Sequence, residues 1–326
     1  MKSASLVARS LGLALFALTA ASGYAQTSSF PNRPIRVVVI VPPGGGGDTV
    51  ARTAANALGA AYSQPAVVEN RPGAGGTIAT NIVAKSPADG YTLLVSDQGA
   101  TVHAAALFKQ LPYDPARDLT MVSWIATTTF VLVAGPGLKA TNLKELIEQA
   151  KAKPGSIAYG NAGAGTHHHL SMELFKLRSG TDFNPVFYKG GAPAVQDAVG
   201  GQIPIAVSGL VTTESLIKSG KLRLIAVMGQ KRFPGYPDVP VLAEYAPGFE
   251  GVSMLGVWAP AGTPRDILLN LNQVLTKSLA VPENIKRLTD LGLDPLVRNL
   301  DESQRIWQNE LAVWPDPIRK LKITLD

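Results

Sequence analysis

Apolar and polar positions follow two patterns along this chain, and segments with one pattern alternate with segments with the other. Short runs rich in β-branched residues predict buried strands, whereas apolar residues recurring every three or four positions predict amphipathic helices. We expect strands at residues 35–41, 66–69, 91–95, 130–134, 157–159, 185–188, 203–207, 222–227 and 252–258. We expect helices at residues 48–61, 77–85, 142–153, 166–178, 212–218 and 264–280. This alternation predicts an α/β fold of doubly wound type, with mainly parallel sheets covered by helices on both faces.

The length of the chain predicts two domains, because residues 26–326 are too many for one small core. A strand, a glycine turn and a helix follow one another once in each domain, which predicts a central cleft between the domains. We expect the chain to cross between the domains near residues 124–129 and again near 250–253. Domain 1 would then be discontinuous, made of residues 26–125 plus 252–326, and domain 2 would be residues 126–251. The tail, residues 282–326, has a nearly all-helical pattern.

The first 25 residues have the pattern of an export signal. Lys2 and Arg9 give a positive start, residues 11–21 form an apolar stretch, and small residues surround Tyr24 before a predicted cleavage after Ala25. No later segment reaches about 18 uninterrupted apolar residues, the length of a membrane-spanning helix. We therefore expect residues 26–326 to be a soluble protein of the periplasm.

Composition excludes several kinds of site. The chain has no cysteine, which rules out disulfides, thiolate nucleophiles, cysteine zinc sites and a lipid anchor on a thiol. Removing the two charges of Lys2 and Arg9 from the net charge of +6 leaves +4. The basic residues are scattered, with no run of five and no aromatic residues interleaved, so nucleic acid is not expected as a partner.

Two glycine-rich turns are the strongest functional signal. One lies in residues 36–58 and the other in residues 156–176, each between a strand pattern and a helix pattern. Glycines let neighbouring backbone N–H groups point into one space, and a helix that starts there favours an anion. Neither turn has the lysine of a phosphate loop or a dinucleotide fingerprint, so no cofactor is expected. The two turns predict one anion site closed from two sides.

Individual residues in these turns have two interpretations. Asp48 is either the N-cap of the first helix or an acceptor for a ligand ammonium or hydroxyl group. Thr166 is either a plain N-cap or a direct ligand contact through its hydroxyl. The glycine-rich residues 70–80 form either a turn that starts the second helix or a third anion loop. Residues 188–191 follow a strand and open a helix, so their backbone can face the cleft, where Lys189 is the one cation of the motif.

The triple histidine, residues 167–169, does not predict a metal site. Successive helical side chains point about 100° apart and cannot converge on one ion. We expect His167 to lie nearest the ligand and His168 to face solvent, while His169, like the matching histidine of the family that the chain resembles (see below), is expected to pack or hydrogen-bond under the loop. The fourth histidine, His103, is distant in sequence and does not complete a set of metal ligands.

An enzyme is the rival class. The chain shows no Ser-His-Asp arrangement with supporting motifs and no close carboxylate pair in its loops. A nicotinamide enzyme needs an acidic residue after the second strand, and Glu69 stands there. The four-glycine turn has the wrong fingerprint, and export does not suit that cofactor. We expect a binding protein and no catalysis.

At the level of motifs the chain resembles the periplasmic solute-binding receptors of tripartite tricarboxylate transporters, often called Bug-type receptors. The resemblance covers essentially the whole chain after the export signal and rests on several motifs in order: RPIRVVVIVPPGGGGDTVAR, VVENRPGAGGTIAT, ADGYTLL, LPYDPARDL, GNAGAGTHHHLSMELFK, YKGGAPAVQDAVGGQIPI, GKLRLIAV, PDVPVLAE and WAPAGTP. It implies a type II periplasmic-binding-protein fold, of the Venus flytrap kind. It also implies capture of a small carboxylate and its delivery to membrane permease subunits.

The resemblance and the glycine turns together give a set of expected ligand-binding residues. They are Pro43, Gly45, Gly46, Gly47, Asp48, Thr49, Ser96, Gln98, Asn161, Ala162, Gly163, Gly165, Thr166, His167, His169, Gly190 and Ser208. The expected ligand is a mono- or dicarboxylate or an acidic amino acid, bound by a monomer. A ligand-sensing subunit of a sensor kinase is the alternative role for the same fold.

Overall fold

The computed structural model describes residues 30–229, 231–247, 251–321 and 323–325. Residues Arg33–Asp326 group into one compact unit, and the description below concerns that unit. The expected export signal lies outside the described residues. Among the helices that are described, none combines the length and hydrophobicity needed to cross a membrane.

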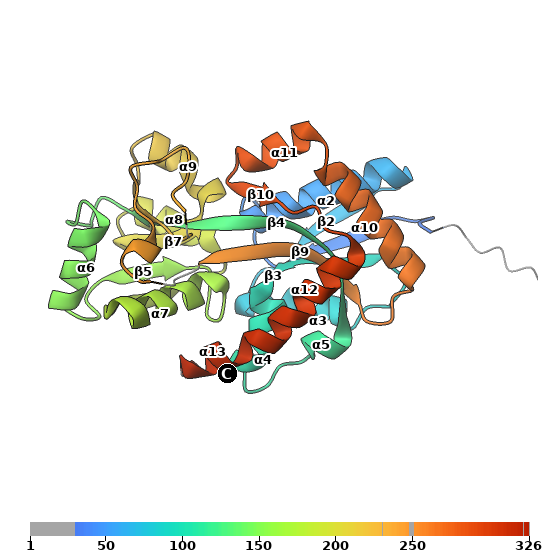
Figure 1. The fold of residues 1–326 in the computed structure, drawn as a ribbon, viewed down its shortest axis with the longest axis horizontal. Coiled ribbons are helices and arrows are strands. Elements are labelled where there is room, and N and C mark those ends of the chain that lie inside the picture. The colour runs from blue at the N-terminus through green and yellow to red at the C-terminus, as the bar shows by residue number, and fades with distance from the viewer. Residues whose placement is uncertain (1–29, 230, 248–250, 322, 326) are drawn as a thin grey trace, which may run out of the picture. The chain divides into compact units, whose positions relative to one another are not determined.

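A mixed ten-stranded sheet forms the centre of the unit (Figure 1). The strands run in the order β2-β1-β3-β9-β4-β7-β5-β6, and β8 and β10 also pair with β4. Their bounds are β1 (Ile35–Val39), β2 (Ala66–Asn70), β3 (Thr92–Asp97), β4 (Leu119–Ala134), β5 (Ala158–Asn161), β6 (Asn184–Phe187), β7 (Ile205–Gly209), β8 (Arg223–Val227), β9 (Val252–Pro260) and β10 (Leu293–Pro295). Strands β1, β2 and β3 are parallel, as are β5, β6 and β7, whereas β4 and β9 run antiparallel to their neighbours.

Helices follow most of these strands, in keeping with the predicted α/β class. The longer ones are α2 (Gly46–Tyr62), α3 (Thr77–Ala84), α6 (Leu143–Ala152), α7 (His167–Ser179), α8 (Gly191–Val199), α9 (Leu210–Lys218), α10 (Arg265–Leu279), α11 (Pro282–Thr289) and α12 (Leu300–Val313). Short helical segments are η1 (Ala74–Gly76), η2 (Gly99–His103), α4 (Ala104–Leu107), α5 (Pro115–Asp118), η3 (Leu242–Glu244) and α13 (Pro315–Lys320). Because parallel strands send their helices from the same sheet edge, several helix starts meet there.

Strand β4 changes partners along its length. Its first part, through Thr129, pairs with β9, and from Phe130 onward it pairs with β7 and β8. One core on the β9 side packs around Trp124 and Trp258, whose rings meet edge-on at 5.3 Å. Another core packs beyond Phe130, around Tyr159 and α6. The proposed domain boundaries near residues 125 and 252 remain a prediction.

The structure departs from the predicted elements in three places. The sheet is not mainly parallel, because β4 runs antiparallel to β7, β8, β9 and β10, and β9 runs antiparallel to β3. Strand β4 begins at Leu119, well before the predicted residue 130. The tail contains β10, which pairs antiparallel with β4, so the all-helical pattern is wrong at Leu293–Pro295. Each of these segments is short or rich in polar and small residues. Whether such a segment forms a strand or a helix depends on its neighbours in space. The helix that residues 188–191 are expected to open is confirmed as α8, which begins at Gly191.

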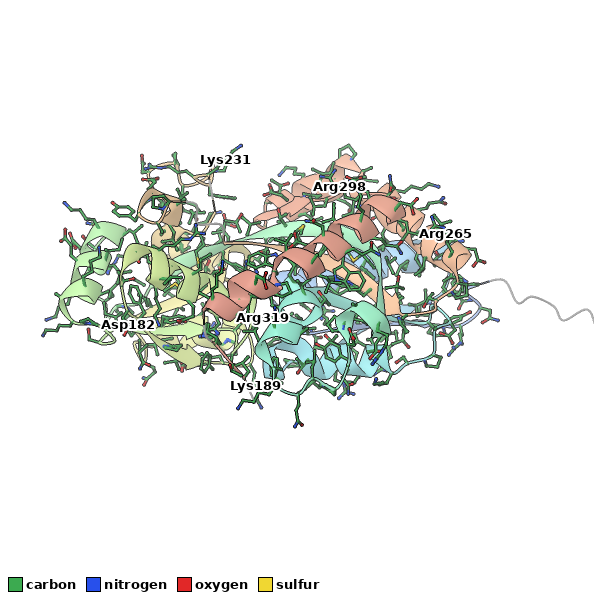
Figure 2. All side chains as sticks on the ribbon, turned by 60° about the horizontal axis from the view of Figure 1, so that its bottom comes forward. Asp182, Lys189, Lys231, Arg265, Arg298 and Arg319 are labelled. Atoms are coloured by element: carbon green, nitrogen blue, oxygen red, sulfur yellow. The ribbon has the colours of Figure 1, made fainter. Side chains whose placement is uncertain are left out.

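Charged side chains gather on the outside of the unit. Figure 2 labels Asp182, Lys189, Arg265 and others, which project away from the ribbon. Inside, several buried polar residues stand at or near the ends of strands, among them Asp97, Asn161 and Ser208. Buried polar groups need partners, so these strand ends are where a ligand site is expected.

Candidate functional site

A cleft made of two adjoining cavities lies where the glycine turns meet. The cavities share Ile40, Val41, Asp97, Ala162 and His168. The smaller has a volume of about 60 Å³ and the larger about 350 Å³. We call the pair the glycine-loop cleft. Residues of both glycine turns line this cleft, as expected for one site reached by both turns.

Four helix starts surround the smaller cavity. Its wall includes Gly45–Gly47 at the start of α2, His168 in the first turn of α7, Gly191 at the start of α8, and Gly209 just before α9. The first N–H groups of a helix have no partner within the helix, and each helix start carries a partial positive charge. Four such starts around one small space favour a negatively charged group there, although the wall contains no arginine or lysine and does contain Asp97.

The first glycine turn offers free donors. Within the described part of the chain, the N–H groups of Gly45, Gly46 and Gly47 have no hydrogen-bond partner. The N-cap of α2 is Gly45, so the N-cap interpretation of Asp48 is wrong. The buried Asp48 carboxylate instead accepts from the N–H of Gly44 at 3.0 Å, and also binds Arg52 and Asn70. Asp48 thus holds the turn in shape and has its acceptors occupied.

The second glycine turn uses most of its donors internally. The N–H of Gly163 donates to Asn161 Oδ1 at 2.9 Å, and the N–H of Gly165 donates to His169 Nδ1 at 3.2 Å. The expected role of His169 under the loop is therefore confirmed. Thr166 stands at the N-cap position of α7, but its hydroxyl donates to the Gly163 carbonyl at 2.7 Å instead of capping the helix.

Asp97 is the ionisable residue common to both cavities. It ends β3, and its Oδ1 accepts the N–H of Gly99 at 2.8 Å. Burial raises the pKa of its carboxyl group to about 6, and the hydrogen bond from Gly99 opposes that rise. Near neutral pH the cleft therefore contains a carboxyl group that changes charge just below the physiological range.

His167 and His168 point in directions other than those expected from the sequence. His168 lines both cavities of the cleft, and its ring centroid lies 4.1 Å from that of Phe130, so the solvent-facing orientation is wrong. Burial, with a smaller effect of the charge on His167, lowers the pKa of His168 to about 3, so the ring is neutral. His167 points away from the cleft into a different cavity, beside His103.

The remaining predicted residues divide between the cleft and its surroundings. Ser96, Ala162 and Ser208 line the smaller cavity, and Ala162, Gly163, Thr166 and Gly190 line the larger one.

Other predicted residues do not line the two cavities. Pro43 is exposed, and the Thr49 hydroxyl donates to the Gly45 carbonyl at the start of α2. Gln98 points to the same separate cavity as His167, where it binds Glu310 and the N–H of Met254. Asn161 and Gly165 support the second turn from behind.

The two sides of the cleft approach each other closely. A Cβ atom built at Gly190 would lie 2.6 Å from Pro42 Cδ, and one at Gly75 would lie 2.8 Å from the Ala164 carbonyl oxygen. Only glycine fits at these two contacts. The loop of Gly73–Gly76 thus forms part of the wall of the larger cavity, together with the exposed Lys189.

Sequence reasoning missed three contributors. Asp97 lies between the expected residues Ser96 and Gln98 but was not singled out, although an acid at the end of a buried strand is a usable signal. Thr128 and Thr212 also line the smaller cavity. They lie on β4 and α9, whose approach to the glycine turns depends on the sheet order and leaves no local motif.

The described residues contain no group of three or more His, Asp or Glu side chains placed to hold a metal ion. In particular, His167, His168 and His169 point into three different environments.

Comparison with known proteins agrees with this geometry. Residues 50–323 match the family model for the tripartite tricarboxylate transporter family receptor, TctC. The chain is 36% identical over 294 residues to Protein BugT of Bordetella pertussis, covering 90% of both chains. Among solved structures it is similar to R. palustris Rpa4515 with adipate, with a TM-score of 0.86, 34% identity, and coverage of 90% of this chain and 99% of that one.

A second similar structure is MatC from Rhodopseudomonas palustris with bound malate. It has a TM-score of 0.81 and 32% identity, and the match covers 89% of this chain and 100% of that one. These relatives confirm the type II periplasmic-binding-protein fold and the resemblance drawn from the motifs. The chain belongs to the TctC family of periplasmic solute-binding receptors, the Bug-type receptors of tripartite tricarboxylate transporters.

Proposed function

We propose that this receptor captures a small carboxylate in the glycine-loop cleft, without catalysis. The observation that supports this most is the convergence of four helix starts on the smaller cavity, with the N–H groups of Gly45–Gly47 unused. A charge-assisted hydrogen bond contributes about 1.5–3 kcal/mol, and a helix start adds about 0.3–1 kcal/mol. Three or four such contacts, less the cost of immobilising the ligand, are compatible with micromolar affinity, about −8 kcal/mol.

Asp97 affects which carboxylates this site can bind. Above pH 6 the carboxyl group is mostly ionised and repels a bare dicarboxylate, but it accepts a hydrogen bond from a ligand hydroxyl or ammonium group. This is the role that the sequence allowed for Asp48, whose acceptors are already occupied. We therefore favour a hydroxy acid or an acidic amino acid over a plain dicarboxylate. Adipate and malate, found in the similar structures, form a suitable pair of probes.

Isothermal titration with malate and adipate tests the proposal. Gly191→Val should weaken malate binding at least about tenfold, or about 1.4 kcal/mol, because its Cβ would lie 2.6 Å from Ser208 Oγ and fill the cavity. Gly137→Val is the matched control, since a Cβ there meets nothing closer than 4.0 Å. Malate binding unchanged by Gly191→Val, in a protein whose thermal unfolding is also unchanged, would place the ligand elsewhere.

Delivery of the ligand to membrane permease subunits is the second part of the proposal. It rests on the family and on the predicted export signal, with cleavage after Ala25. N-terminal sequencing of protein recovered from the periplasm tests the cleavage. Cross-linking to membranes in the presence of malate tests the partner, because recovery of a sensor kinase instead of a permease would assign the receptor to signalling.

A further inference from the structure

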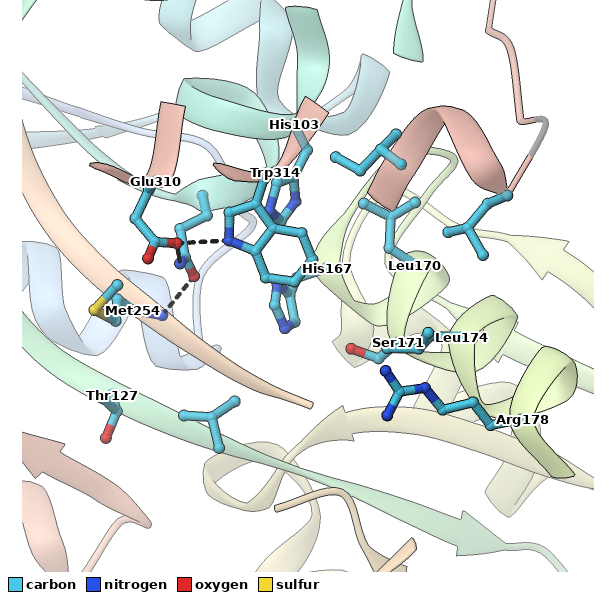
Figure 3. Close-up of a pocket in the computed structure, with 14 residues that line it drawn as sticks. His103, Thr127, His167, Leu170, Ser171, Leu174, Arg178, Met254, Glu310 and Trp314 are labelled. Atoms are coloured by element: carbon cyan, nitrogen blue, oxygen red, sulfur yellow. Dashed lines mark hydrogen bonds between the residues drawn. The ribbon is translucent and has the colours of Figure 1, made fainter. Parts of the chain in front are cut away.

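A second cavity, separate from the glycine-loop cleft, lies between α7 and the α12–α13 segment (Figure 3). Its volume is about 440 Å³, and it shares no lining residue with the cleft. We call it the histidine pocket, after His103 and His167. Its other walls come from β4, from β9 and from the residue that follows β3, Gln98. Cavities of about 300–1,000 Å³ are the usual size of small-molecule sites.

The two histidines of this pocket are buried without partners. His103 is 0% exposed and His167 is 3% exposed, and all four of their ring nitrogens lack a hydrogen bond in the described structure. Their ring centroids lie 5.6 Å apart, and that of His103 lies 4.8 Å from Trp314. Burial lowers the pKa of both imidazoles, so each neutral ring has one donor and one acceptor. Since buried polar atoms are normally paired, a bound molecule is the natural source of their partners.

The rest of the pocket wall is largely apolar. Leu170, Leu174, Met254, Ile318 and Leu321 face it, with the indole of Trp314. Such a wall binds an apolar body, and a flat one in particular, through the indole face. The one acid in the wall is Glu310, which already accepts from Gln98 Nε2 and from Trp314 Nε1, each at 2.6 Å (Figure 3). Glu310 is thus held by neutral donors of the protein.

Arg178 gives the pocket its charge. It is the one arginine or lysine in the pocket lining, and in Figure 3 its guanidinium group points inward beside Ser171. It donates to the Pro247 carbonyl at 3.0 Å and has no ion-pair partner among the described residues. A guanidinium group with free N–H groups at the edge of an apolar cavity suits a carboxylate, which it can bind through two parallel hydrogen bonds.

We propose that the histidine pocket is a second ligand site, for an aromatic hydroxy acid. The carboxylate pairs with Arg178, the ring packs against Leu174 and Trp314, and the hydroxyl group lies between His103 and His167, donating to one imidazole and accepting from the other. This assignment accounts for the unpaired imidazoles, the apolar wall and the unpaired cation together. It is independent of the solute bound in the glycine-loop cleft.

Titration calorimetry with 4-hydroxybenzoate tests the site, in a Gly191→Val background that blocks the cleft. One equivalent should bind in that background. Adding Arg178→Ala should weaken binding at least about tenfold, the effect expected of losing a charged hydrogen-bonded partner. Arg305→Ala is the matched control, because Arg305 is an exposed helical arginine outside the pocket lining and should leave the affinity within about twofold.

His167→Phe separates the hydroxyl contact from mere occupancy. It keeps a flat ring and removes both nitrogens, so 4-hydroxybenzoate should bind about as weakly as benzoate, while benzoate binding itself stays within about twofold. The quenching of tryptophan fluorescence on binding gives an independent signal, since Trp314 lines the pocket. The proposal is overturned if 4-hydroxybenzoate fails to bind when the cleft is blocked, or if Arg178→Ala or His167→Phe leaves its affinity unchanged.

Discussion

The two glycine-rich turns look alike in sequence and differ in what they offer a ligand. In the first, side-chain acceptors take only the N–H of Gly44 and leave Gly45–Gly47 free. In the second, Asn161 and His169 take the N–H groups of Gly163 and Gly165. A glycine in a loop therefore does not by itself mean a free donor. In the second turn the glycines are needed for backbone shape, with φ values of +127° at Gly163 and +75° at Gly165.

The largest expected effect comes from placing the same side chain in each turn. Gly165→Val should lower the free energy of unfolding by roughly 2–4 kcal/mol, because it adds a strained positive φ to crowding. Its Cβ would lie 2.7 Å from Leu325 Cδ1 and 3.2 Å from Leu107 Cδ1. Gly45→Val has nothing within 4 Å and should change that free energy by less than about 1 kcal/mol, while weakening malate binding.

Urea unfolding of the two variants, with malate titrations on each, checks this contrast. Equal losses of stability would show that the turns are equally constrained. Loss of malate binding in Gly165→Val at wild-type stability would show that the second turn does donate directly to the ligand.

Substitution of Asp97 should have an intermediate effect on stability, and the size of that effect depends on pH. Its pKa is about 6 in the folded protein, compared with an ordinary value of 3.8, so the folded state binds the proton more tightly. The free energy of unfolding therefore falls as pH rises from about 4 to 6, and stays lower above pH 6. Asp97→Asn should remove this loss and raise the free energy of unfolding at pH 8 by about 1–3 kcal/mol.

The same variant should change ligand preference. Adipate should bind wild-type protein several-fold more tightly at pH 5.5 than at pH 8, because protonation of Asp97 removes the repulsion. In Asp97→Asn that dependence should vanish, apart from the ionisation of adipate itself, and His168 stays neutral throughout because its pKa is about 3. Titrations at both pH values check this, and the same pH dependence in both proteins would exclude Asp97 as its source.

The smallest effect is expected at Thr166. Its hydroxyl already donates to the Gly163 carbonyl, so Thr166→Ala should cost about 1 kcal/mol of folding stability and leave malate affinity within about twofold. Thermal unfolding and calorimetry on the same sample check both numbers. A drop in affinity without a drop in stability would make Thr166 a direct ligand contact.

Local patterns were enough to predict most strands and helices, the family and the meeting of the two turns. They could not assign β4 before residue 130, because Thr120, Ser123 and Thr127 interrupt its apolar run. They also predicted that the three histidines point apart, but not which one faces the cleft. Which histidine faces the cleft depends on how α7 packs between the cleft and the histidine pocket. That packing is determined by the assembled sheet and not by the local sequence.

Strand β4 has a mechanical consequence. One uninterrupted backbone of 16 residues belongs both to the part of the sheet next to β9 and to the part next to β7 and β8. Rotation of one part against the other must therefore be taken up as torsion within that strand, around Thr129 and Phe130, without sliding its residue pairs. We expect such a shared strand to act as an elastic hinge that allows only a small angular movement between the two parts.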